Sequence, residues 1–111
     1  MPYLGEFEQL LLLAILQCAD TADGAYTVPI GRLIAAKTGR AVARGALHTS
    51  LDRLEAKGLV ASRLGEPLAI RGGRSRRYFT VTRTGMAALR TARAAVHNLS
   101  AGLEAVLDRR R

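Results

Sequence analysis

The chain has 111 residues, the size of one domain, with a net charge of +8, a single cysteine and two histidines. One cysteine cannot form an internal disulfide, and His48 and His97 are too far apart in the sequence for a typical metal motif, so neither a disulfide scaffold nor a metal cofactor is expected. The apolar run at residues 10–16 is too short to span a bilayer, and no basic residue precedes it as in a signal peptide. We therefore expect a cytoplasmic protein with no membrane partner and no cofactor.

The positive charge is concentrated in the middle of the chain. Residues 1–28 carry four acidic and no basic side chains, whereas residues 29–93 carry fourteen basic and three acidic ones. A localised surplus of this kind is the usual footprint of a polyanion partner, although net charge also serves solubility. The charge alone favours a nucleic-acid partner without proving one.

The first predicted element is a helix over residues 4–20. Its apolar residues recur at helical spacing, and further leucines make most of the remaining surface apolar as well. Such a helix lies either at the centre of the domain or in an interface with a second subunit. The main stripe is formed by Leu4, Phe7, Leu11, Ala14 and Cys18.

Two more helices are expected after a turn. A short extended piece is predicted around residues 26–28, and Pro29 suits the first turn of a helix that ends at Gly39. A third helix, residues 42–57, carries Leu47, Leu51 and Leu54 on one face. Its opposite face is predicted to be exposed.

A hairpin and a long last helix complete the chain. Strands are predicted at residues 59–64 and 77–81, joined by a basic loop of about ten residues, which is longer than most hairpin loops and so is typical of a functional loop. Thr82 is a candidate N-cap. The helix that follows has a heptad-like apolar seam nearly to the C terminus, which only Gly102 weakens. This seam consists of Leu89, Ala92, Val96, Leu99, Leu103 and Val106.

The order of these elements is that of a winged helix-turn-helix. We expect a mainly α fold with a small β-hairpin wing, in which residues 1–82 form the DNA-binding domain and residues 83–111 a long C-terminal dimerisation helix. In a helix-turn-helix the second helix of the motif enters the major groove, where side chains distinguish base pairs. The hairpin loop reaches the flanking backbone or minor groove.

The candidate DNA contacts lie on the third helix and on the wing. Thr49 and Arg53 are expected to meet bases, and Arg44 and Lys57 phosphates, whereas His48 is either a contact or a packed residue. Asp52 would be repelled by phosphate, so it either pairs with Arg53 or a neighbour, or accepts from a cytosine amine. On the wing the candidates are Arg74 at the tip, Arg76 and Arg77. Strand alternation points Arg76 and Arg77 to opposite faces and predicts different roles for them.

Three stretches of the chain resemble the PadR-like transcriptional regulators. They are LGEFEQLLLLAIL, GALHTSLDRLEAKGLV and GGRSRRYFTVTRTGMAAL, in the order found in that family. The third is the most specific, with its Gly-Arg wing, Tyr78, Phe79 and the Thr82-x-x-Gly85 helix start. His48 and Ser75 depart from the family, which usually has a tyrosine and a proline there, so DNA contacts through that tyrosine do not carry over.

The resemblance implies a homodimer held by the first and last helices. The expected interface residues are Leu4, Phe7, Leu11, Leu89, Ala92, Val96, Leu99, Leu103 and Val106. The family is often controlled by a small hydrophobic or aromatic effector between the subunits. Phe7, Leu11, Val96 and Leu99 would line such a pocket, and the alternative is a closed dimer core.

No arrangement of residues in the sequence is typical of an enzyme. It has no close Ser-His-Asp set, and GGRSR lacks the lysine and following helix of a phosphate-binding loop. The sequence therefore predicts a dimeric, sequence-specific regulator, most simply a repressor at a palindromic operator. Two alternatives stay open: a non-specific architectural DNA-binding protein, and an effector-sensing or interaction module with weakened DNA binding.

Overall fold

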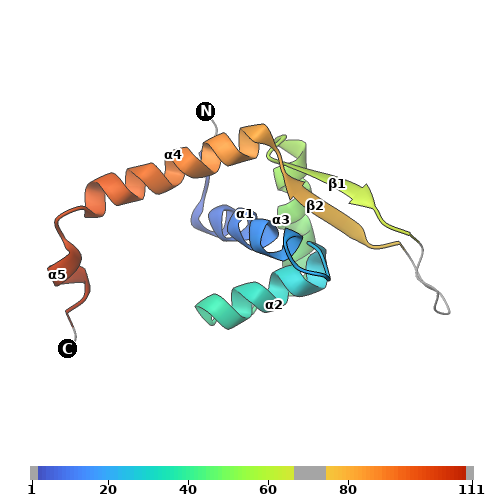
Figure 1. Ribbon diagram of the computed structural model, residues 1–111, viewed down its shortest axis with the longest axis horizontal. Coiled ribbons are helices and arrows are strands. Elements are labelled where there is room, and N and C mark those ends of the chain that lie inside the picture. The colour runs from blue at the N-terminus through green and yellow to red at the C-terminus, as the bar shows by residue number, and fades with distance from the viewer. Residues whose placement is uncertain (1–2, 67–74, 110–111) are drawn as a thin grey trace.

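Three helices, a β-hairpin and a long fourth helix follow one another in the computed structural model, which describes residues 3–66 and 75–109 (Figure 1). The elements are α1 (Glu6–Ala19), α2 (Thr27–Thr38), α3 (Arg44–Ala56), β1 (Val60–Leu64), β2 (Arg77–Val81), α4 (Arg83–Ser100) and α5 (Glu104–Leu107). This mainly helical chain with a two-stranded hairpin confirms the predicted fold class. None of the helices described has the length and apolar content needed to cross a bilayer.

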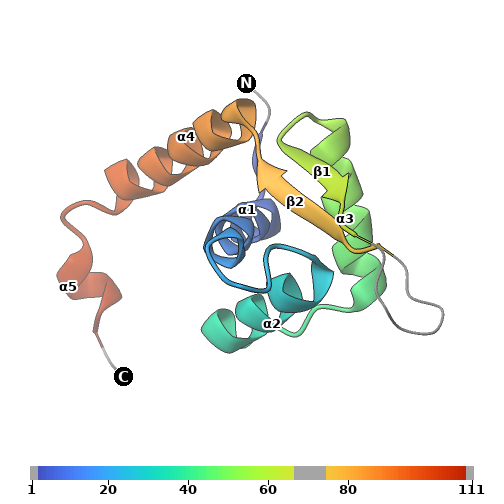
Figure 2. The ribbon, with the colours of Figure 1, turned by 45° about the vertical axis from the view of Figure 1, so that its right-hand side comes forward.

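Helix α1 lies at the centre of the core, where it contacts α2, α3, α4 and β2 (Figure 2). Leu11, Leu12 and Ile15 are completely buried. The central position explains why α1 is apolar on most of its surface, since the chain itself covers several of its faces. The helix begins after Gly5, whose backbone N–H donates to Glu8 Oε1 at 3.1 Å.

Helices α2 and α3 form the helix-turn-helix that packs against α1. Gly39 ends α2 in the left-handed conformation, with a φ of 73°, as the sequence predicted. In α3, Leu47, Leu51 and Leu54 face the core, also as predicted. The extended piece expected at residues 26–28 is shorter than predicted: α2 already begins at Thr27.

The hairpin packs against the helices through its inner face. Strands β1 and β2 pair antiparallel with Val60 opposite Val81 and Ser62 opposite Phe79. On the outer edge of β2, the Phe79 N–H donates to the Ala25 carbonyl at 2.8 Å, so the segment before α2 adds one hydrogen bond to the sheet. Phe79 and Val60 are buried on this face, but Leu59 next to Val60 is buried too and Leu64 is 70% exposed, so burial along the first strand does not follow the predicted alternation.

Helix α4 begins at the predicted N-cap and is held close to β1. The Thr82 hydroxyl accepts from the Gly85 N–H at 3.0 Å and donates to the Gly58 carbonyl at 2.6 Å. A Cβ on Gly85 would lie 2.0 Å from the Leu59 carbonyl oxygen, so only glycine permits this approach. The first turns of α4 are thereby fixed against the hairpin.

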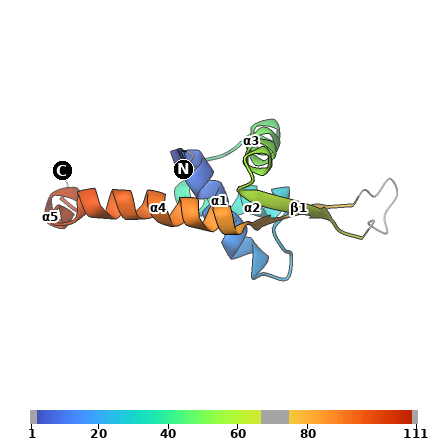
Figure 3. The same cartoon turned by 90° about the horizontal axis from the view of Figure 1, so that it is seen from above.

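The C-terminal helix is shorter than the sequence predicted. It ends at Ser100, and Gly102, with a φ of 87°, redirects the chain into the short α5. A left-handed residue cannot continue a right-handed helix, so the predicted seam is interrupted before Leu103 and Val106. Beyond its first turns α4 projects away from the helices, on the side opposite the wing (Figure 3).

Candidate nucleic-acid interface

The outward face of α3 presents polar and basic side chains to solvent. Arg44, His48, Thr49 and Arg53 are all exposed, so His48 is not a packed residue. Among residues 3–66 and 75–109, neither Arg44 nor Arg53 forms an ion pair. These cations are available to a polyanion.

Lys57 at the end of α3 interacts with α1. Its ammonium group lies 2.7 Å from Glu8 Oε2. Burial raises the pKa of Glu8, but the hydrogen bonds from Lys57 and the Gly5 N–H, with the nearby charges of Lys57 and Arg53, outweigh burial and lower it overall. Lys57, which the sequence proposed as a phosphate contact, therefore has a carboxylate partner within the chain.

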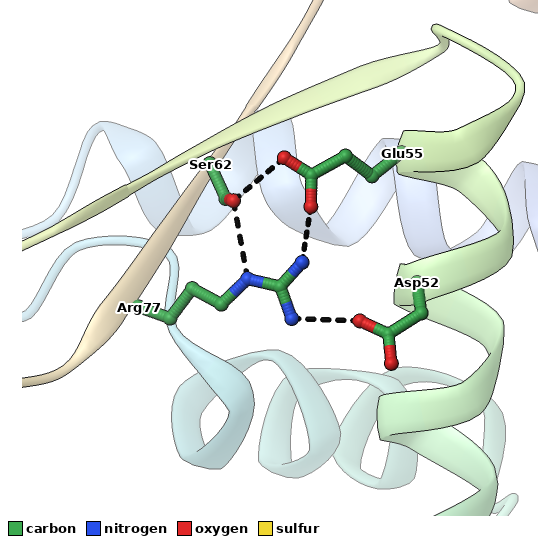
Figure 4. Close-up of polar contacts among 4 residues, drawn as sticks. All are labelled: Asp52, Glu55, Ser62 and Arg77. Atoms are coloured by element: carbon green, nitrogen blue, oxygen red, sulfur yellow. Dashed lines mark hydrogen bonds and ion pairs between the residues drawn. The ribbon is translucent and has the colours of Figure 1, made fainter.

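Arg77 connects the wing to α3. Its guanidinium donates to Asp52 Oδ1 at 2.7 Å, to Ser62 Oγ at 3.1 Å and to Glu55 Oε1, while the Ser62 hydroxyl donates to Glu55 Oε2 at 2.7 Å (Figure 4). We call these four residues the Arg77 cluster. Arg77 also lies over the Phe79 ring, 4.8 Å from its centroid. Of the two alternatives for Asp52, pairing with a neighbour in space is the one observed.

The charges in the Arg77 cluster stabilise one another. The Ser62 hydroxyl and then Arg77 lower the pKa of Glu55, despite some burial. The hydrogen bond to Asp52 raises the pKa of Arg77, partial burial opposes it, and Glu55 adds to the increase. Both shifts favour the charged forms of Glu55 and Arg77.

Arg76 lies in a different environment from Arg77. Its guanidinium lies over the Tyr26 ring, 4.3 Å from the centroid, and Arg63 lies over Tyr78 at 4.9 Å. The two tyrosines pack edge to face at 5.8 Å. Arg76 and Arg77 thus have separate partners, as strand alternation predicted. Arg74, with Gly72 and Gly73, lies outside the described residues.

Sequence reasoning did not identify Glu55, Ser62 and Tyr26 as part of this surface. The spacing of Asp52 and Glu55 places both carboxylates on neighbouring positions of one helix. Strand alternation places Arg77 on the same face as Ser62 once the register is known. The sequence did not define the pairing register of β1 and β2, because the loop that joins them is too long.

The residues predicted for a dimer interface fall into three groups. Leu4, Leu11 and Leu89 are buried within the chain and leave no surface for a partner, so they belong to the core. Phe7 and Ala92 are half-buried against that core. The other four are exposed: Val96, Leu99, Leu103 and Val106.

A cavity of about 460 Å³ lies between the N-terminal segment and α4. Leu4, Gln9, Ala92 and Val96 contribute to its lining. Of the four residues expected around an effector, only Val96 lines this cavity, because Leu11 is completely buried and Leu99 projects into solvent. The expected pocket is therefore not assembled within one chain.

The described residues contain no group of three potential metal ligands.

Comparison with known proteins places the fold in one family. Residues 15–91 match the transcriptional regulator PadR-like family. A PadR family transcriptional regulator from Eggerthella lenta is similar in structure, with 26% identity, a TM-score of 0.64 and coverage of 92% of this chain and 84% of the other. No curated protein matches the sequence.

Two more solved structures share the fold. A PadR-like transcription factor from Bacteroides fragilis has 21% identity and a TM-score of 0.69, over 90% of this chain and 88% of the other. A PadR family regulator from Clostridium difficile has 20% identity and a TM-score of 0.67, over 89% and 96%. The chain belongs to the PadR-like family and is a winged-helix, DNA-binding transcriptional regulator.

Proposed function

We propose that this protein is a sequence-specific repressor that binds a palindromic operator as a homodimer. The observation that carries this proposal is the outward face of α3, where Arg44, His48, Thr49 and Arg53 are exposed beside the wing. A helix with this composition, in second position of a helix-turn-helix, fits the major groove. Bound there, the protein would exclude competing proteins from the same DNA.

Within this proposal the candidate side chains have distinct roles. Thr49 and Arg53 read base edges, His48 lies beside them, and Arg44 contacts phosphate. On the wing, Arg76 meets the DNA backbone, and Arg74 is proposed for the tip. Lys57 and Arg77 are secondary candidates, since each already pairs with carboxylates of the chain.

The homodimer is supported by apolar side chains beyond the core. Val96 is 62% exposed and Leu99 is 84% exposed, although both continue the apolar face of α4. We propose that a second copy covers them, with residues 83–111 as the dimerisation part and 1–82 as the DNA-binding part. The two α3 helices would then enter major grooves about 34 to 36 Å apart, one duplex turn.

The dimer has a direct test. Leu99→Asp should shift the mass measured by light scattering from two chains to one, while the unfolding midpoint of the monomer stays unchanged. Arg90→Asp, at an exposed residue on the opposite face of α4, is the matched control. A Leu99→Asp protein that remains a dimer would contradict the proposal.

A small hydrophobic effector is proposed for the cavity between the N-terminal segment and α4. Its volume of about 460 Å³ lies in the usual range for ligand sites, and it opens beside the exposed part of α4. A ligand there would alter how α4 leaves the core and so the spacing of the two α3 helices. Thr91→Trp, at a cavity-lining residue outside the proposed dimer contact, should abolish any ligand-induced release from DNA.

DNA binding is tested with the region upstream of the protein's own gene and a random duplex, at moderate salt. Binding should favour the upstream region, and affinity should fall steeply with salt because phosphate neutralisation releases counterions. Arg53→Ala should reduce the preference, by about 1 to 3 kcal/mol if Arg53 reads a base pair. Equal affinity for both duplexes would favour the architectural alternative.

A further inference from the structure

Arg77 occupies a position where the wing and α3 meet. Three of its nitrogen atoms donate to three different residues, of which Asp52 and Glu55 belong to α3 and Ser62 to β1. The planar guanidinium fixes the directions of its donors, so a contact with all three defines the orientation of β2 relative to α3. A lysine at this position would act as a point charge and would not define that orientation.

The carboxylates of the Arg77 cluster lie on or next to the DNA-facing side of α3. The Asp52 side chain is 60% exposed. In the sequence, Asp52 lies directly between the core leucine Leu51 and the exposed Arg53. A free carboxylate beside the base-reading residues would repel DNA phosphates. Arg77, which also pairs with Glu55, offsets part of this charge from within the chain, at a distance of 2.7 Å from Asp52.

We infer that Arg77 is a positioning residue, which holds the wing at a set angle to α3 and offsets one of the two negative charges of Asp52 and Glu55, so that both elements meet DNA as one preformed surface. This inference rests on the proposed DNA-binding function and differs from it in assigning Arg77 to the protein rather than to phosphate. Each ion pair is partly exposed and weak alone. The shared guanidinium, the Ser62 hydrogen bonds and the Phe79 ring below it act together at one point.

The inference is tested by measuring the cost of Arg77→Gln in two backgrounds. In the natural background, the substitution leaves two unpaired carboxylates on α3 and releases the wing, and we expect at least about a tenfold loss of affinity for the preferred duplex. In a background of Asp52→Asn with Glu55→Gln, Arg77 has no carboxylate on α3 to pair with and keeps only neutral partners such as Ser62. There the loss should shrink to about twofold.

A direct phosphate contact would behave differently. Arg77→Gln would then reduce affinity by the same factor in both backgrounds and would lower the salt dependence of binding by about one counterion in each. This additive outcome would overturn the inference. Arg76→Gln is the matched control, because Arg76 lies on Tyr26 and not on α3, so its cost should be equal in both backgrounds.

A second measurement needs no DNA and separates the two proposals. Spin labels are attached to Ala56 on α3 and Leu64 on β1, both exposed, after the buried Cys18 is replaced by Ala. Arg77→Gln should broaden the distance distribution between the labels, whereas Arg76→Gln should not. An unchanged distribution would overturn the inference about Arg77. If Arg77→Gln broadens the distance distribution but the protein binds all duplexes equally well, the result would count against the proposed function alone.

Discussion

Two regions of this protein use the same apolar residue types in different ways. In the body, residues 3–66 and 75–92, leucines such as Leu11 and Leu51 are completely buried. In the arm, residues 93–109, Leu99 is 84% exposed and Leu107 is 65% exposed. Helical spacing identifies the apolar face of both regions equally well. The face is thus a property of the helix, whereas its burial depends on what lies opposite.

The largest difference should appear when the same leucine is truncated in each region. Leu51→Ala leaves a cavity in the centre of the body and should lower the free energy of unfolding by about 2 to 5 kcal/mol. Leu99→Ala should change the free energy of unfolding of the monomer by less than about 0.5 kcal/mol. Denaturant titration at a concentration where the protein is monomeric measures both, and equal losses would show that the arm packs on the body.

The junction between body and arm depends on Gly85. Gly85→Ala places a methyl group against the Leu59 carbonyl, so α4 must move, and unfolding should become easier by about 2 to 3 kcal/mol. Gly45→Ala is the control, since no atom lies within 4 Å of a Cβ added there. Alanine also stabilises a helix by about 1 kcal/mol relative to glycine. Both variants lose a glycine, so the difference in midpoint isolates the contact. A Gly85→Ala protein as stable as the original would refute a close junction.

Acid should weaken the body before it affects the arm. The folded pKa of Glu8 lies below its ordinary value, so its contribution to stability is present at neutral pH and is lost as the pH falls through that folded pKa. The effect is less than about 1 kcal/mol, because the pair with Lys57 lies near the surface. Unfolding midpoints measured between about pH 5 and pH 3 should fall less steeply in Glu8→Gln. A Glu8→Gln protein whose midpoint falls as steeply as that of the original would contradict this role of Glu8.

The smallest effect on stability is expected at Gly102. Its φ of 87° suits glycine, and alanine would cost about 1 to 2 kcal/mol there, whereas in a continuous helix alanine is favoured by about 1 kcal/mol. Gly102→Ala should therefore join α4 and α5 and increase the helical signal in circular dichroism. The midpoint for the body should not change. If the helical signal stays constant, contacts other than the glycine determine the bend.

The elements of the body were largely predictable from the sequence. The apolar spacing in α1 and α3, the left-handed Gly39 and the Thr82 cap are local features, and local physical chemistry decides them. The C-terminal helix was predicted too long because its apolar spacing continues past Gly102. Apolar spacing shows where these side chains would lie if the helix continued, but the helix ends at Ser100, and Ala101 and the left-handed Gly102 have non-helical backbone angles.

What the sequence alone determined is the order of elements, the faces that they bury and the concentration of positive charge between residues 29 and 93. The tertiary structure decided how individual charges are used. Arg53 is exposed, Arg76 lies on Tyr26, and Arg77 is paired with carboxylates from a helix 22 and 25 residues earlier in the chain. The reason is physical: a charge interacts with whatever lies within a few ångströms, and only the folded chain brings those groups together.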